Sequence, residues 1–134
     1  MDVAASMQAV ADRLDVITGL RCYGYPVGKV TPPAAVVSYP TALDFDETYG
    51  RGSDRLTLPV VLVVGKASDR AARDALGAYC NGTGPRSVKA TLESGAYTAF
   101  DSIRVVSVDF DVYTIAAVDY LTAIFAIDLY GQGS

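Results

Sequence analysis

Residues 55–65 read Arg-Leu-Thr-Leu-Pro-Val-Val-Leu-Val-Val-Gly, and this stretch decides the fold. The even positions from 56 to 64 are all Leu or Val, so the alternation predicts a β-strand with one apolar face. Val61 and Val63 make the second face apolar as well, which predicts a strand covered on both sides or closed on one side by another subunit. Pro59 has no N–H to donate, so we expect an edge or a bulge at that position.

The C-terminal third of the chain predicts a β-hairpin built from residues 103–113 and 120–130. In the first strand, one face carries Val106, Val108, Phe110 and Val112, while Ser107, Asp109 and Asp111 alternate with them. A turn over residues 114–119 sets Val112 opposite Leu121 and Val108 opposite Phe125. The apolar faces of the two strands then coincide, which supports this register.

Helical periodicity occurs at 3–18, at 69–80 and in a short segment that Pro85 opens. Between them we expect a loop over 20–34, a strand at 34–39 and an additional strand near 44–48. The predicted order is α-β-β-α-α-β-β, in a single domain spanning residues 1–134. Strands separated by helices in this way favour an α+β fold: a mixed, mainly antiparallel sheet of four to five strands with the helices packed on one face.

Composition excludes several classes of function. Of 134 residues, 51% are hydrophobic and the net charge is −4, which excludes a disordered chain and a basic nucleic-acid module. The chain contains no His, so a histidine base and histidine-bound metal are excluded. No apolar run approaches the roughly 20 residues of a membrane helix, and no membrane partner is expected. We predict no catalytic residue, no metal and no cofactor, and therefore no enzyme.

Several groups of polar residues allow two interpretations. Asp109 and Asp111 share one strand face near Asp128, and such carboxylates either bind Ca²⁺ or Mg²⁺ or form a solvated face that discourages aggregation. The solvated face is favoured. A second acidic group, Asp44, Asp46 and Glu47, lacks the rest of a calcium-loop pattern. The turn at 81–87 precedes a helix and resembles an anion site, but a glycine-capped turn is the favoured interpretation.

Cys22 and Cys80 are far apart in the sequence, and we expect two free thiols. Without His, the usual activation of a cysteine nucleophile is lacking.

Residues 49–55 form a glycine-containing, mixed-charge stretch that we interpret as a loop ordered on assembly. The mean hydropathy of +0.26 supports an apolar surface that meets a partner. Tyrosine is frequent at interfaces because its ring packs while its hydroxyl stays hydrated. The residues predicted to contact another subunit or partner are Tyr49, Arg51, Asp54 and Arg55, followed by Tyr25 and Lys29.

Six segments carry a resemblance that spans essentially the whole chain. They are Gly24-Tyr25-Pro26, residues 30–37 (Val-Thr-Pro-Pro-Ala-Ala-Val-Val), 46–54 (Asp-Glu-Thr-Tyr-Gly-Arg-Gly-Ser-Asp), 63–66 (Val-Val-Gly-Lys), 68–73 (Ser-Asp-Arg-Ala-Ala-Arg) and 87–89 (Ser-Val-Lys). With the Ala-rich N-terminal helix, this pattern resembles the tail terminator proteins of long-tailed (siphovirus) phages of actinobacteria. The shared motifs are structural and not catalytic.

The resemblance implies a virion protein at the head–tail junction, assembled in the host cytoplasm. It implies a homohexameric ring that caps the tail tube, ends its polymerisation and joins the tail to the head connector. Its partners would be further copies of itself, the major tail tube protein, the connector (stopper) protein and genomic DNA that passes through the lumen without sequence-specific binding. The alternatives are another head–tail connector component or a tail tube protein and, from a different class, an enzyme or small-molecule binding module.

Overall fold

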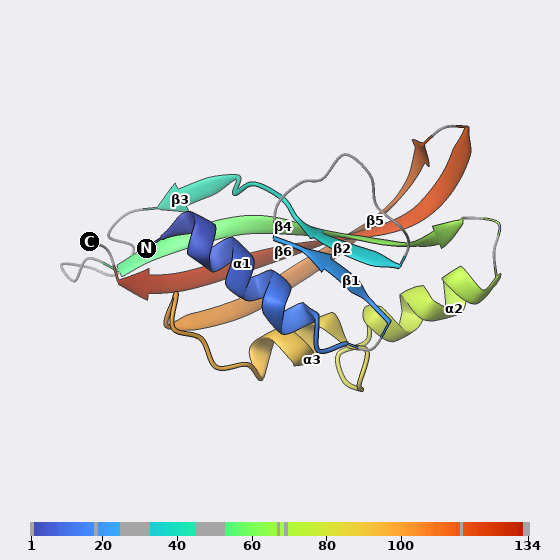
Figure 1. The fold of residues 1–134 in the computed structure, drawn as a ribbon. Coiled ribbons are helices and arrows are strands. Elements are labelled where there is room, and N and C mark those ends of the chain that lie inside the picture. Colours follow the sequence, from blue (N-terminus) through green and yellow to red (C-terminus); the bar gives the residue numbers. More distant parts are fainter. Residues whose placement is uncertain are drawn as a thin grey trace.

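The computed structural model describes residues 2–17, 19–24, 33–44, 53–66, 68, 70–115 and 117–132. These residues form a six-stranded sheet with three helices, which confirms the predicted α+β fold but with more strands than the four to five predicted (Figure 1). The helices are α1 (Val3–Leu14), α2 (Arg70–Tyr79) and α3 (Val88–Glu93). The strands are β1 (Arg21–Tyr23), β2 (Ala34–Val37), β3 (Ala42–Asp44), β4 (Ser53–Lys66), β5 (Ser102–Ile115) and β6 (Val118–Gln132).

The sheet is mixed and mainly antiparallel, as predicted. Its order is β1-β2-β4-β6-β5, with β3 paired to β4 off this path, and the β1–β2 pair is parallel. The prediction of a continuous loop over 20–34 is wrong at its start, because Arg21–Tyr23 forms β1. Three residues are too few to show a strand period, so tertiary pairing with β2 decides this element.

Pro59 occupies neither an edge strand nor a bulge, contrary to the sequence prediction. It lies within the central strand β4, where the pairing partner on one side changes from β2 to β3. The last β2 pair is Val37 with Val60, and the first β3 pair is Ala42 with Thr57. The missing proline N–H therefore falls in the gap between two partners, while the Pro59 carbonyl accepts from the Ser38 N–H at 3.0 Å.

The predicted hairpin register is confirmed over its outer part. Val112 lies opposite Leu121 and Val108 opposite Phe125. The register then shifts between Val105 and Ser107, so Arg104, and not Val105, pairs with Asp128. Because of this bulge, the prediction that Val106 shares a face with Val108 is wrong: Val105 is buried and Val106 is exposed. The predicted turn over 114–119 is shorter, since the strands continue to Ile115 and resume at Val118.

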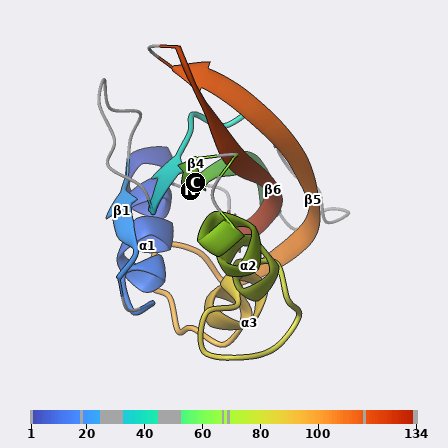
Figure 2. The ribbon, with the colours of Figure 1, turned by 90° about the vertical axis from the view of Figure 1, so that its right-hand side faces the viewer.

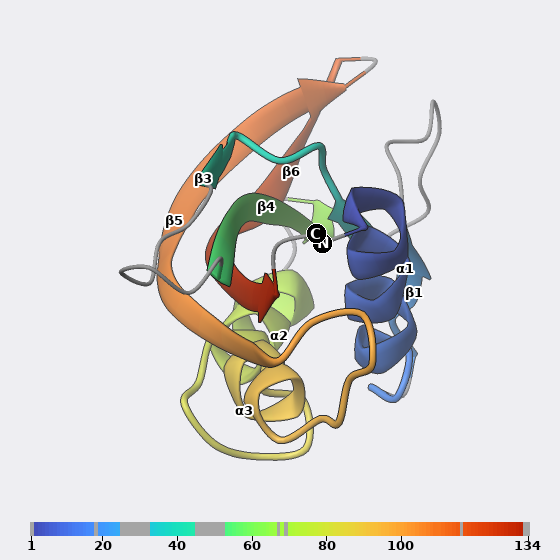
Figure 3. The same cartoon turned by 90° about the vertical axis from the view of Figure 1, so that its left-hand side faces the viewer.

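All three helices pack on one face of a strongly curled sheet (Figures 2 and 3). The even-numbered leucines and valines of β4 point to this side and are buried. Their register neighbours on β6 are odd-numbered residues on the same face of the sheet. Among these, Phe125, Ile127 and Leu129 are also buried. The core therefore lies between the helices and the central strands, as the alternation of residues 55–65 predicts.

Helix α1 ends earlier than its periodicity suggests, at Leu14 and not at residue 18. The Asp2 carboxylate caps its N-terminus by accepting the Ala5 N–H at 3.1 Å. Near its C-terminus, the Arg13 Nε donates to the Thr91 carbonyl at 2.9 Å, which joins α1 to α3. Gly19, with a φ of +82°, then turns the chain toward β1 in a conformation that favours glycine.

Glu93, at the end of α3, binds the β5 backbone at the bulge. Its carboxylate accepts the Val105 N–H at 3.0 Å and the Lys89 ammonium at 2.7 Å. The Lys89 hydrogen bond, supported by the Val105 N–H, lowers the pKa of Glu93 below its ordinary value of 4.5. This contact holds the bulge of β5 against the helical layer.

We expect the substitution Glu93→Gln to lower the free energy of unfolding at pH 7 by about 1 kcal/mol, since a charge-assisted hydrogen bond is replaced by a neutral one at a partly exposed site. A lowered folded-state pKa stabilises the fold above the unfolded pKa, and the contribution is lost as pH falls through the folded pKa. Urea unfolding at pH 7 and pH 3 should therefore show a difference in the free energy of unfolding between the two proteins that is smaller at pH 3. Asp74→Asn, which removes the exposed Arg73–Asp74 pair, should change little at either pH. A gap of equal size at both pH values would contradict the prediction.

Candidate functional site

Four of the six predicted contact residues, Tyr49, Arg51, Tyr25 and Lys29, lie outside the described residues. The other two, Asp54 and Arg55, belong to β4, so the predicted loop over 49–55 is wrong at its C-terminal end. Asp54 is only 4% exposed and pairs in register with Gly131 of β6. The structure therefore assigns Asp54 to the strand, and the role of the six residues as contacts stays a prediction.

The most exposed apolar surface of the sheet follows strand β5. We call it the β5 edge surface, and it consists of Val106, Phe110, Val112 and Tyr113. Phe110 is 61% exposed and Val112 48% exposed, although both belong to the apolar face that the alternation predicts. Strand β5 is 14 residues long and pairs only with β6, so its other edge carries backbone groups without a strand partner among the described residues.

The exposure of this surface has a geometric origin. Phe110 and Val112 lie opposite Ala123 and Leu121, on the same side of the sheet as the helices. Helix α3 packs against β5 near Val105, so the outer half of the strand extends past it. Figure 2 shows β5 as the outer arc of the sheet, with the helices inside its curve. The sequence pattern correctly gives the face of these residues but does not show where the helical cover ends.

The second face of the sheet, turned away from the helices, also has an apolar centre. Val61, Ile124 and Val36 are half-buried there, and Val63 is buried. In the described part of the chain, the core that contacts the helices contains none of these four residues. The second face of the strand at 55–65 is therefore apolar, as predicted, and its contact with another subunit stays a prediction.

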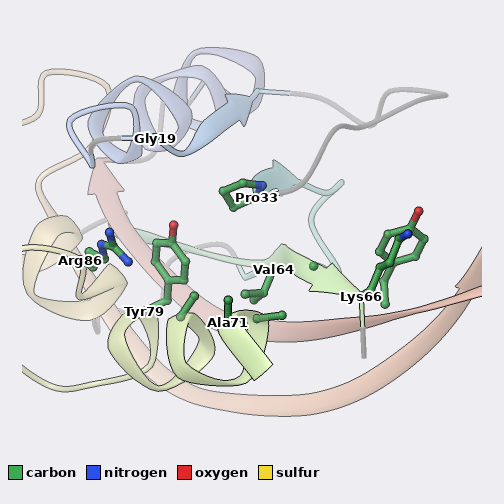
Figure 4. A pocket seen from close by; sticks show the side chains of 11 residues that line it. Gly19, Pro33, Val64, Lys66, Ala71, Tyr79 and Arg86 are labelled. Carbon is green, nitrogen blue, oxygen red and sulfur yellow. The ribbon is translucent and has the colours of Figure 1, made fainter. Parts of the chain in front are cut away.

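A cleft of about 610 Å³ lies at the C-terminal end of β4 (Figure 4). Helix α2 forms one wall through Ala71, Ala75 and Tyr79, and Gly19 and Pro33 lie across from it. Figure 4 shows Arg86 and Lys66 toward opposite ends, with Tyr79 between them. These residues are scattered along the sequence, so no local motif predicts the cleft.

Gly65 allows α2 to approach the end of β4 at the base of this cleft. A Cβ atom at this position would lie 3.0 Å from the Ala72 Cβ atom, closer than packed carbons normally come. The register of β4 on β6 shifts between Val63 and Gly65, which places the glycine against the helix.

We expect Gly65→Ala to lower the free energy of unfolding by about 1 kcal/mol, because the added methyl group overpacks the contact with α2. Gly77→Ala is the matched control: Gly77 lies within α2 with open space around it, so alanine should raise stability by about 0.5 kcal/mol through helix propensity. Thermal unfolding followed by circular dichroism measures both. If both substitutions changed the melting temperature by the same amount in the same direction, the close approach of α2 to Gly65 would carry no cost in free energy of unfolding.

Cys22 and Cys80 are free and partly buried, as expected. Burial, with a smaller contribution from Asp15, raises the pKa of Cys22 to about 12, and burial raises the pKa of Cys80. Neither thiol forms a nucleophilic thiolate at neutral pH.

The acidic residues of the hairpin do not converge on a common point. Asp128 accepts a hydrogen bond from the Thr57 hydroxyl at 3.1 Å, and Asp111 accepts one from the Val112 N–H at 2.8 Å. Among the residues that the structure describes, no group of three His, Cys, Asp or Glu side chains is placed to hold a metal ion. Asp44 contributes its backbone to β3, while Asp46 and Glu47 lie outside the described residues.

Within the same described ranges, no helix has the length and hydropathy needed to cross a membrane. No protein-family model matches the chain, and a search of curated proteins also finds no match.

Proposed function

We propose that this protein is a ring-forming structural subunit of a phage tail, a tail terminator that caps the tail tube and joins it to the head connector. The observation that carries the proposal is the β5 edge surface. A long edge strand with several exposed apolar side chains is a typical site of association between chains. The resemblance of the whole sequence to tail terminators indicates which kind of assembly this would be.

The charge of the chain suits a conduit for DNA. Each copy carries a net charge of −4, so a ring of several copies is acidic. Like charge keeps a passing duplex from binding to the walls of the channel. In this proposal the protein acts through shape and contact, with genomic DNA passing through the lumen and no bond being made or broken.

The proposal is tested on the purified full chain by light scattering and negative-stain electron microscopy, alone and with isolated tail tubes of the phage that encodes it. We expect ring-shaped particles of six copies of the 14.1 kDa chain, bound at the ends of tubes. Long filaments of the protein alone would indicate the alternative of a tail tube subunit. A protein that stays monomeric and binds no tube end would contradict the proposal.

A further inference from the structure

The cleft beside α2 contains polar groups without a partner. Lys66 and Arg86 form no ion pair with any described residue, and the Tyr79 hydroxyl forms no hydrogen bond with one. Tyr79 is only 3% exposed, and its side chain points into the cleft between the two cations (Figure 4). Burial raises the pKa of this hydroxyl, with Arg86 opposing the shift in part, so it remains protonated and able to donate.

These groups select an anionic partner. A cation toward each end of the cleft and a hydroxyl donor between them fit a segment that carries two carboxylates, because charge-assisted hydrogen bonds to carboxylates are strong. The remaining lining, including Val64, Ala72 and Ala75, is small and apolar. The cleft volume is large enough for several side chains of a protein segment.

A second copy of the chain presents a segment with this chemistry. On β5, the exposed Asp109 and Asp111 form no ion pair with any residue in the described ranges. They alternate along β5 with the exposed Phe110 and Val112, which lie on the opposite face of the strand, so one face of β5 offers two carboxylates.

The same carboxylates cannot reach the cleft of their own chain. Asp109 and Asp111 lie opposite Ile124 and Thr122, on the face of the sheet turned away from the helices. The cleft lies on the helical side, against α2. A pairing of these surfaces must therefore join two molecules.

We propose that the cleft of one copy binds the β5 strand of the next copy, with Asp109 and Asp111 facing Lys66, Tyr79 and Arg86. This inference rests on the proposed ring-forming function and names the contact that would build the ring. Because two different surfaces meet, each copy uses its cleft toward one neighbour and its β5 strand toward the other. Such a heterologous contact produces a closed ring when the rotation between copies closes.

Two charge-reversal variants test the contact. The cleft variant carries Lys66→Glu with Arg86→Glu, and the edge variant carries Asp109→Lys with Asp111→Lys. Each places like charges across the interface, so we expect the concentration needed for half-assembly to rise about tenfold or more, as measured by native mass spectrometry. Arg73→Glu, at an exposed position on α2 outside the cleft lining, is the matched control and should assemble like the wild type.

Mixing the two variants gives the decisive result. The acidic cleft of one variant complements the basic strand of the other, and the unchanged cleft and strand complement each other at the next contact. We therefore expect an equimolar mixture to form rings in which the variants alternate, with an even number of copies. Recovery of assembly also shows that both variants are folded.

Assembly of both variants at the wild-type concentration would overturn this inference and leave the proposed function standing. Loss of assembly in each variant without recovery in the mixture would overturn it as well, because the two surfaces would then not contact each other. A wild-type chain that forms no ring and binds no tube end would instead refute the proposed function, and this contact with it.

Discussion

Replacing Ile127 by alanine is expected to lower the free energy of unfolding by about 3 kcal/mol. Ile127 is fully buried in β6, where it lies opposite Leu58 of β4 and Val105 of β5. Its side chain faces the layer of helices, so truncation removes buried methyl groups and leaves a cavity that the rigid central strands cannot close. Urea unfolding followed by circular dichroism measures the change, at several protein concentrations because association adds to the stability of the folded state.

Ile124→Ala is the matched control for this prediction. Ile124 has the same side chain and belongs to the same strand, but it lies on the second face of the sheet and is only half-buried. We expect a loss of about 1 kcal/mol or less, because part of its apolar area is already in contact with water. Equal losses at the two positions would contradict the conclusion that the core lies on the helical side alone.

The second large effect concerns association. We expect Val112→Lys to raise the concentration for half-assembly about tenfold or more and to leave the fold intact. Val112 belongs to the β5 edge surface and is 48% exposed, so a lysine there is tolerated by the monomer. In the assembly, the ammonium group would have to lose its hydration at an apolar contact, and edge lysines are a common means of preventing association between strands.

Val16→Lys tests whether this effect is specific to β5. Val16 follows helix α1 and is 63% exposed, so the substitution introduces the same charge at a valine that is more accessible than Val112. Sedimentation velocity over a range of concentrations should show a monomer for the β5 variant and unchanged assembly for the control. If the two variants behave alike, the β5 edge surface is not the site of association.

The hairpin shows what sequence patterns predict well and where they lose accuracy. Period-two alternation places Val108 opposite Phe125 and Val112 opposite Leu121, since only that register aligns both apolar faces. The bulge at Val106 interrupts the same alternation and reverses the roles of Val105 and Val106. A run of consecutive valines is compatible with either phase, so the sequence pattern cannot locate the extra residue.

The candidate surfaces were harder to predict than the fold. The two glycines and the serine that precede Asp54 predict a loop, but its pairing with Gly131 places Asp54 within the sheet. The cleft combines residues from α2, β4 and the segments around β1. Its polar groups line one cleft only because tertiary packing brings these segments together. No linear motif carries such information.

The sequence by itself determined the fold class, the core face of β4 and the outer register of the hairpin. Each follows from the period of apolar residues, because burial of apolar area is the dominant driving force of folding. The tertiary structure alone decided that Pro59 fits between two pairing partners, that the helical cover ends before Phe110, and that Lys66, Tyr79 and Arg86 meet in one cleft. These features depend on the distance and angle between elements, and an alternation pattern within one element contains no measure of either.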